Sequence, residues 1–228
     1  MPTQGDLFGL AGVYGYVSAI IIITWVARSR MHNPRKVLHI LTGGIVFFWW
    51  AFETREIMAF LAAAPFAVLL LLCTPISPVR LLRESPLGSR STEGHPYGLV
   101  MYAVSWTLIA YFLFEDLVAA SIAIAAMSFG DGMGEFIGKR YGKRRYLNHR
   151  TLEGSAAVFI STFIAIIIIE LFYFEMIGYS SGGAPDMLVL FGLSTAGLVT
   201  CLEAITPGHI DNLVIPLIVG GYLHMLGV

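Results

Sequence analysis

Charged residues are scarce in this sequence, and their scarcity excludes an ordinary soluble protein. Only 13% of the 228 residues are charged and 57% are hydrophobic, whereas soluble domains typically carry about 25% charged residues. A soluble fold of this length has too little interior to hide so much apolar surface, and a lipid bilayer removes that difficulty. The net charge of −1 gives no excess of cations that would indicate a nucleic-acid partner.

Cysteine is also rare. Cys73 and Cys201 are the two cysteines, and both lie within apolar runs. Their number and positions argue against a disulfide framework, and the spacing typical of cysteine metal sites is absent. The first residues lack the basic segment that begins a signal peptide, so we expect the first apolar run to be a retained helix.

Long apolar runs are abundant, and their lengths predict an all-α, polytopic transmembrane bundle. A membrane-spanning helix needs about 20 apolar residues. About eight spans are expected, although six or seven are also possible because two runs are short. The runs cover residues 8–27, 37–52, 57–73, 97–114, 116–137, 154–177, 187–206 and 212–227. We therefore expect one transmembrane domain over residues 1–228, with no soluble domain.

The cations are distributed very unevenly over this topology. Arg55 is the exception on one side, while the other 13 of the 14 lysines and arginines fall in loops 28–36, 74–96 and 138–153 on the opposite side. By the positive-inside rule, the basic side is cytoplasmic and both termini are outside. This predicts a plasma or endoplasmic-reticulum-type membrane protein. An oligomer is compatible with the sequence, although no feature indicates one.

Two acidic residues stand near the cytoplasmic end of the fifth run. Asp131 and Glu135 are four residues apart, so their carboxylates share one helical face. Charges at membrane depth are costly unless they are paired or hydrated. One explanation is a divalent metal, since Mg²⁺ prefers carboxylate oxygens. The other is a structural ion pair with arginine or lysine.

Glycines and cations surround this acidic pair. Gly130 and Gly132 flank Asp131, which suits a close approach of the backbone to a ligand. Gly134 and Gly138 have the spacing with which membrane helices pack closely. The cations that follow, and that we expect to hold phosphate oxygens, are Lys139, Arg140 and Lys143. The glycine and lysine spacing of a soluble nucleotide-binding P-loop is absent.

Three further polar segments fall on the same side of the membrane. The segment 148–155 leads into the sixth run, where the amide groups of a helix N-terminus can bind an anion. Thr151 is a plausible N-cap of this helix. Glu153 is either a capping acid or a contact to a ligand. A turn between the last two runs places Glu203 near Asp211. In the second run, His39 lies one helical turn after Arg35 and Lys36. Either helix packing or a catalytic role explains this histidine.

Cations and carboxylates gathered at one membrane face fit phosphoryl transfer with a nucleotide and Mg²⁺, because such catalysis consists mostly of positioning and charge neutralisation. Since no soluble domain is expected, the second substrate should arrive through the membrane and should be a lipid.

The motifs together resemble the CTP-dependent lipid-alcohol kinases, which include dolichol, polyprenol and phytol kinases and a CTP-dependent diacylglycerol kinase. The resemblance covers residues 33–217. It rests on Arg35-Lys36-x-x-His39, on Gly130-Asp131 with the glycines that follow, on Thr151-x-Glu153-Gly154-Ser155, and on Glu203 with Asp211-Asn212 and Pro216. Arg150 stands where the family usually has lysine, and Ile210 precedes Asp211 where many relatives have a second acid.

This resemblance implies an enzyme that transfers the γ-phosphoryl group of CTP to a membrane lipid alcohol at the cytoplasmic face. The expected catalytic residues are Asp131, His39 and Glu135. The expected ligands of Mg²⁺ are Asp131, Asp211, Glu135 and Glu203. The residues expected to bind the nucleotide or its phosphates are Arg35, Lys36, Gly130, Gly132, Lys139, Arg140, Lys143, Arg150, Thr151, Glu153, Gly154, Ser155 and Asn212.

Three other interpretations remain open. A related cytidylyltransferase would make a CDP-lipid from similar motifs. An ion-coupled transporter would use buried carboxylates, but such groups commonly lie near the midplane of the bilayer. A non-enzymatic membrane partner protein leaves the acids on one face unexplained.

Overall fold

The computed structural model describes residues 1–27, 29, 34–84, 97–178, 185–208 and 210–227, with the side chains of residues 35, 149 and 185–187 left out. These residues form helices and no strand. The bounds are α1 Gln4–Val26, α2 Pro34–Thr42, η1 Gly43–Ala51, α3 Arg55–Ile57, η2 Met58–Ala63, α4 Ala64–Leu72, α5 Arg80–Arg83, α7 Gly98–Phe112, α8 Leu117–Ala125, η3 Ala126–Asp131, α9 Gly132–Tyr141, η4 Leu147–His149, α10 Leu152–Ile177, α11 Pro185–Ile205 and α12 Asp211–Leu226.

The helices agree with the prediction of an all-α membrane protein. In the described part of the chain, five helical stretches are long and apolar enough to cross a bilayer: Gln4–Val26, Arg55–Leu72, Leu117–Tyr141, Leu152–Ile177 and Leu188–Ile205. Three further apolar stretches, Lys36–Ala51, Gly98–Phe112 and Asp211–Leu226, are shorter. Each of the eight expected runs is therefore helical, while the number that span the membrane stays a prediction.

Two of the expected helices differ from a simple continuous α-helix. The second run is α-helical only to Thr42 and continues as a 3₁₀ helix from Gly43, where two consecutive glycines weaken the α-helical preference. The fifth run passes through a π-helical segment that ends at Asp131 and then extends to Tyr141. The prediction that this helix ends at residue 137 is therefore wrong. Lys139 and Arg140 lie in its last turn and not in a loop.

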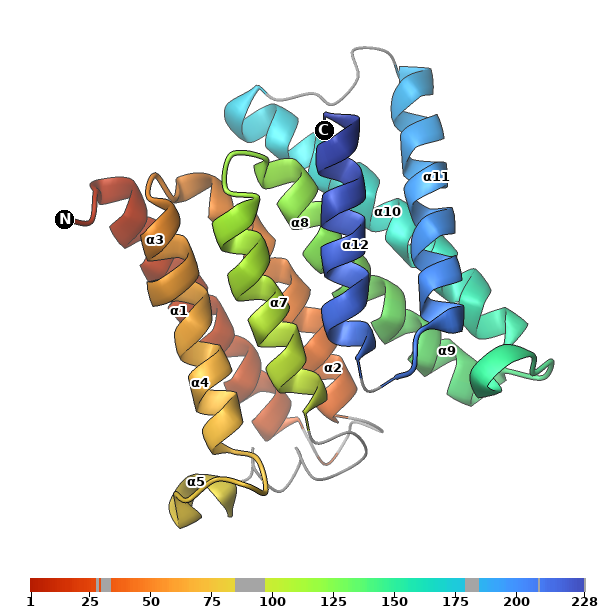
Figure 1. The fold of residues 1–228 in the computed structure, drawn as a ribbon, viewed down its shortest axis with the longest axis horizontal. Helices are drawn as coiled ribbons and strands as arrows, with labels where there is room; N and C mark the ends of the chain where they lie inside the picture. Colours follow the sequence, from red (N-terminus) through yellow and green to blue (C-terminus); the bar gives the residue numbers. More distant parts are fainter. Residues whose placement is uncertain (28, 30–33, 85–96, 179–184, 209, 228) are drawn as a thin grey trace.

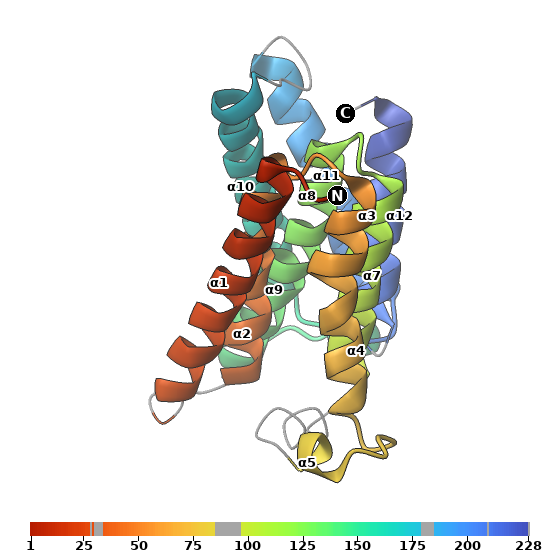
Figure 2. The same ribbon diagram turned by 90° about the vertical axis from the view of Figure 1, so that its left-hand side faces the viewer.

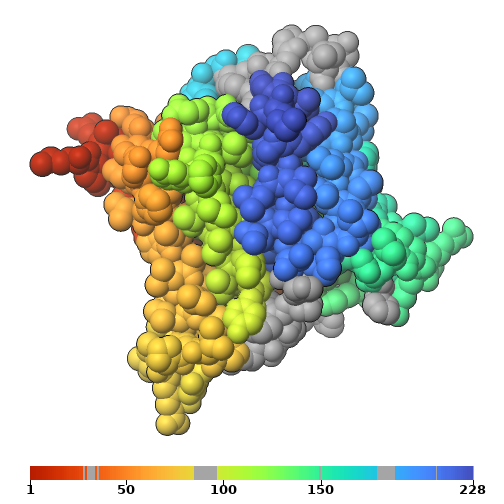
Figure 3. Space-filling model, in the orientation of Figure 1, coloured from red at the N-terminus to blue at the C-terminus, as the bar shows by residue number. Residues whose placement is uncertain are grey.

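The helices form one bundle whose two ends differ in character. Figures 1 and 2 show both chain termini toward the upper end of the bundle. The first turns of α2, α7, α10 and α12 lie at the lower end together with the last turns of α9 and α11. Figure 3 shows α4, α7, α12 and α11 side by side across one face, in agreement with their packing contacts. All four polar segments named from the sequence therefore meet at the lower end.

Close packing of α9 on α10 fixes one side of that end. A Cβ atom added to Gly154 would lie 3.0 Å from the carbonyl oxygen of Gly134 and 3.3 Å from Cα of Gly138. These neighbours are backbone atoms, so they cannot move aside as a flexible side chain can. The expected packing role of Gly134 and Gly138 is confirmed. Gly154, expected to contact nucleotide, is the residue that lets their backbones approach.

Candidate active site

An ion-pair cluster buried between α2 and the η3–α9 helix is the centre of the candidate site. Nζ of Lys36 lies 2.5 Å from Oδ2 of Asp131 and 2.8 Å from Oε2 of Glu135. The two carboxylates therefore do share one helical face, as their spacing predicts. Asp131 is 6% exposed, and a buried carboxylate needs such a partner because its desolvation is costly.

His39 lies one turn after Lys36 and faces the same carboxylate. Its Nε2 atom is 3.9 Å from Oδ2 of Asp131, is buried, and has no hydrogen-bond partner in the described part of the chain. The backbone of Met127 also interacts with the ring. When the neutral imidazole carries its proton on Nδ1, Nε2 is the acceptor nitrogen. A buried acceptor beside a carboxylate is well placed to take a proton from a substrate hydroxyl.

Arg150 forms a second cluster with the acids of the α11–α12 turn. Its guanidinium lies 2.8 Å from Oε1 of Glu203 and 3.6 Å from Oδ2 of Asp211. Both acids are nearly buried, at 3% and 5% exposed. A guanidinium has several donors in a fixed plane, so it can hold two carboxylates at once.

The two clusters act on each other electrostatically. Arg150 has a Coulombic interaction with Asp131. Asp131 and Lys36 each have one with Glu203 and with Asp211. Residues from α2, η3–α9, the 142–151 loop and the α11–α12 turn thus belong to one site. The expectation that these segments meet at one end of the molecule is confirmed.

The loop that carries Arg150 is held in place by local hydrogen bonds. Arg145 and Thr151 form an isolated β-bridge, and the Thr151 hydroxyl accepts a hydrogen bond from the Gly154 amide, which confirms Thr151 as the N-cap of α10. Asn148 has a φ of 49°, in the left-handed region that asparagine tolerates better than most residues. Its amide donates to the carbonyl of Ala204 at 3.1 Å and so ties the loop to α11.

Other residues expected at the site have structural partners. The Glu153 carboxylate accepts the backbone amide of Lys143 at 3.0 Å, so it closes the loop. The Ser155 hydroxyl pairs with the Tyr146 hydroxyl at 2.5 Å. Lys139 pairs with Glu135 at 2.5 Å and is largely exposed. Contacts of these residues with phosphate stay predictions.

The remaining expected cations and glycines are placed less centrally. Arg140 and Lys143 are exposed, and the side chain of Arg35 lies outside the described residues. A Cβ on Gly130 would lie 2.5 Å from Oγ1 of Thr162, and one on Gly132 would meet Ile40. Helix packing therefore accounts for both glycines, and a backbone contact of theirs with a ligand stays a prediction.

Oxygen atoms suited to Mg²⁺ lie on the two helices that the α11–α12 turn joins. Oε2 of Glu203 and Oδ1 of Asn212 are buried and have no hydrogen-bond partner among the described residues, and such oxygens are the ligands that Mg²⁺ prefers. Within the same described residues, no three His, Cys, Asp or Glu side chains are gathered as a ready-made metal site. Because Mg²⁺ is often held by one or two carboxylates plus substrate phosphates, the residues present fit a metal that arrives with a nucleotide.

Two residues of the site were not foreseen. Tyr102 of α7 packs its ring edge-on against His39, with centroids 4.9 Å apart, and its hydroxyl shares a 2.7 Å hydrogen bond with Ser128. Ser128 precedes Gly130-Asp131 and so carried a weak sequence signal. Tyr102 lies in an apolar run and carried none.

Comparisons with known proteins find several lipid-alcohol kinases similar in sequence to this chain. A probable chloroplastic phytol kinase of Triticum aestivum is 31% identical over 91% of this chain and 71% of its own length. A phytol kinase of Synechocystis is 28% identical over 92% and 86%, respectively. A farnesol kinase of Arabidopsis thaliana is 24% identical over 80% of this chain and 62% of its own length.

Comparisons with family models and with solved structures found no match. The probable phytol kinase of Triticum aestivum is 31% identical and matches most of both sequences. The chain therefore belongs to the lipid-alcohol kinase family that includes phytol kinase and farnesol kinase.

Proposed function

We propose that this protein transfers the γ-phosphoryl group of CTP to the hydroxyl of an isoprenoid alcohol, at the cytoplasmic face of its membrane and with Mg²⁺. The observation that carries the proposal is the meeting of two buried acid–base clusters, Lys36 with Asp131 and Arg150 with Glu203 and Asp211, beside the acceptor nitrogen of His39. The acceptor class follows relatives that are named phytol kinase and farnesol kinase. The choice of CTP follows the resemblance of the motifs to CTP-dependent kinases.

The reaction needs a base for the acceptor hydroxyl. Nε2 of His39 takes the hydroxyl proton as the alcohol oxygen forms its bond to the γ-phosphorus. The bond between that phosphorus and the β–γ bridging oxygen breaks, and CDP leaves with the electron pair. Asp131, 3.9 Å from Nε2, stabilises the imidazolium that forms. A positioned base of this kind typically contributes about 10²–10⁴-fold to the rate.

The cations of the site neutralise the triphosphate. Lys36 and Arg150 are held by carboxylates in this structure, and phosphate oxygens accept charge-assisted hydrogen bonds from the same donors. Glu203, Asp211, Asn212 and Asp131 would hold Mg²⁺. When bound, the metal would neutralise charge that develops on the phosphate oxygens.

CTP labelled separately at its α and γ phosphorus tests the proposal. The purified protein in detergent or vesicles is given phytol, farnesol, a long polyprenol and diacylglycerol in turn. We expect γ label, and no α label, in a lipid monophosphate made from an isoprenoid alcohol. Chelation by EDTA should abolish this transfer, and added Mg²⁺ should restore it.

Other results of the same assay contradict defined parts of the proposal. Transfer of α label to lipid would identify a cytidylyltransferase. Equal or faster transfer from γ-labelled ATP would contradict the assignment of CTP as the phosphoryl donor. Full activity after chelation would show that the transfer needs no metal ion. Label found only in diacylglycerol phosphate would show that the acceptor is not an isoprenoid alcohol.

A further inference from the structure

An apolar pocket lies between helices α1, α2, α4 and α7. Its cavity volume is about 70 Å³, which is room for about five groups of the size of a water molecule. Its lining side chains are aliphatic or aromatic except for Thr42, and the hydroxyl of Thr42 is used by the carbonyl of Leu38 at 2.5 Å. The pocket therefore suits a hydrocarbon. Among its lining side chains, the indole Nε1 of Trp106 is buried and has no hydrogen-bond partner in the described part of the chain.

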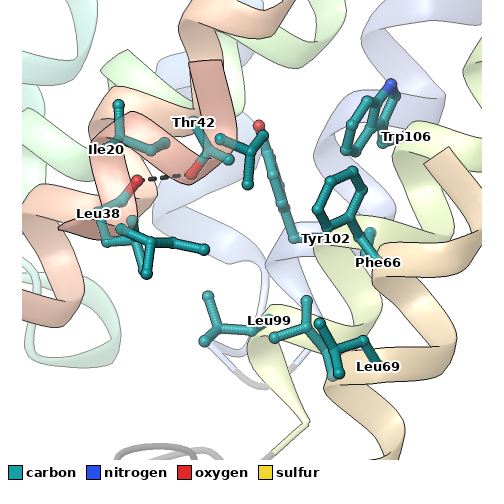
Figure 4. Close-up of a pocket in the computed structure, with 12 residues that line it drawn as sticks. Ile20, Leu38, Thr42, Phe66, Leu69, Leu99, Tyr102 and Trp106 are labelled. Atoms are coloured by element: carbon teal, nitrogen blue, oxygen red, sulfur yellow. Dashed lines mark hydrogen bonds between the residues drawn. The ribbon is translucent and has the colours of Figure 1, made fainter. Parts of the chain in front are cut away.

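The pocket adjoins the candidate active site through one residue. Tyr102 is part of its wall, and Figure 4 shows the ring between Leu38 and Thr42 on one side and Phe66 on the other. The same ring packs against His39, and its hydroxyl reaches Ser128. The Tyr102 ring thus lies between the pocket and His39.

Aromatic side chains close the far end of the pocket. Phe66 stacks on Trp106 with ring centroids 5.5 Å apart, and Trp106 stacks on Trp49 at 6.5 Å. Leu99 and Trp106 are the first and last residues of α7 that line the pocket. They are seven residues apart, or about 10 Å at 1.5 Å per residue. That length holds the first part of an isoprenoid chain, and not the whole of one as long as phytol.

The pocket is open on the side between α1 and α4. Figure 2 shows these two helices diverging toward the lower end of the molecule. Ile21 of α1 and Leu69 of α4 line the pocket and remain 41% and 39% exposed. Because both helices are apolar enough to span a bilayer, this opening faces lipid.

We infer that the pocket is the binding site for the hydroxyl-proximal isoprene unit of the acceptor, which enters from the bilayer between α1 and α4. The hydroxyl points toward His39, Phe66 and Trp106 stop the chain, and the remainder leaves through the opening into lipid. The inference rests on the proposed function. It predicts that the enzyme recognises the chain close to the hydroxyl and tolerates different lengths beyond it.

Leu69→Trp tests the inference, with Leu71→Trp as its matched control. Both residues are leucines of α4; Leu69 lines the pocket, whereas Leu71 is 44% exposed and does not line it. Tryptophan at position 69 should fill the opening and raise KM for the alcohol about tenfold or more, because contact area for the chain is lost. KM for the nucleotide should stay unchanged, and Leu71→Trp should behave as wild type. Equal alcohol KM values for the two variants would overturn the inference.

Photo-crosslinking gives a readout that does not need activity. A farnesol analogue with a diazirine on its first isoprene unit should label pocket residues of α4 or α7 in the wild type and should label Leu69→Trp much less. Labelling mainly of α10 or α11 would overturn the inference. If the wild type phosphorylates no alcohol, the proposed function fails, and the crosslinking result still decides whether the pocket binds the chain.

Discussion

The ammonium of Lys36 lies 2.5 Å from the carboxylate of Asp131, although 95 residues separate them in the sequence. This pair joins α2 to the η3–α9 helix in the interior of an apolar bundle. Asp131 has a structural role as the partner of a buried cation, in addition to the catalytic role proposed for it. Experiments on Asp131 must therefore separate folding from chemistry.

Asp131→Asn should lower phosphoryl transfer by about 100-fold or more, because a charged group near the reacting phosphate is lost. It should also destabilise the fold, since breaking a buried ion pair costs about 3–5 kcal/mol, less here because Glu135 also contacts Lys36. The double variant Lys36→Met/Asp131→Asn removes both charges and should regain thermal stability while staying inactive. Recovery of activity in the double variant would show that Asp131 only neutralises Lys36.

His39→Ala should reduce kcat by about 10²–10⁴-fold, the usual contribution of a general base. KM for the nucleotide should change little, because the imidazole is assigned to the acceptor. His224→Ala is the control: His224 pairs with Asp116 near the C-terminus, and its side chain is 61% exposed. If both variants keep wild-type kcat under saturating substrates, His39 is not the base.

Arg150→Lys should raise KM for the nucleotide about tenfold despite keeping the positive charge. Arginine reaches Glu203 and Asp211 together, whereas a single ammonium lacks the planar fork that allows this. Arg145→Gln is a suitable comparison because Arg145 lies in the same loop and is exposed. A larger effect at position 145 than at position 150 in steady-state kinetics contradicts the assignment.

Gly154→Ala should destabilise the protein, because the added methyl group would press on the backbone of Gly134 and Gly138. Gly197→Ala provides the matched control in a helix. No atom lies within 4 Å of a Cβ at position 197, so this change should be neutral or stabilising by up to about 1 kcal/mol. Thermal unfolding in detergent measures both effects. A loss of stability confined to Gly197→Ala would refute the packing argument for α9 and α10.

Lys143→Cys should react with an impermeant maleimide only from the cytoplasmic side, because the positive-inside rule orients the basic loop there. Glu115→Cys, at the other end of the bundle, should react only from outside. Both are made in a background without Cys73 and Cys201, the two native cysteines. The reverse pattern of labelling in intact cells would invert the proposed topology.

The sequence by itself determined the class of the protein and most members of its site. Apolar runs about as long as a bilayer predict helices, because the backbone must satisfy its own hydrogen bonds in lipid. The spacing of Asp131 and Glu135 placed both acids on one face, since a helix repeats every 3.6 residues. Family motifs then marked Arg150, Glu203 and Asp211. These properties are local, so they can be read from neighbouring residues.

The tertiary structure decided which of these residues meet and what lies beside them. Periodicity gives the face of a helix but not its neighbour, so the sequence left open that Lys36 contacts Asp131 or that Arg150 bridges Glu203 and Asp211. Tyr102 joined the site only because its side chain contacts His39 of α2 and Ser128 of η3, and the apolar pocket exists only where four helices converge. Such features depend on the relative positions of segments far apart in the chain, and those positions are set by packing of the whole bundle.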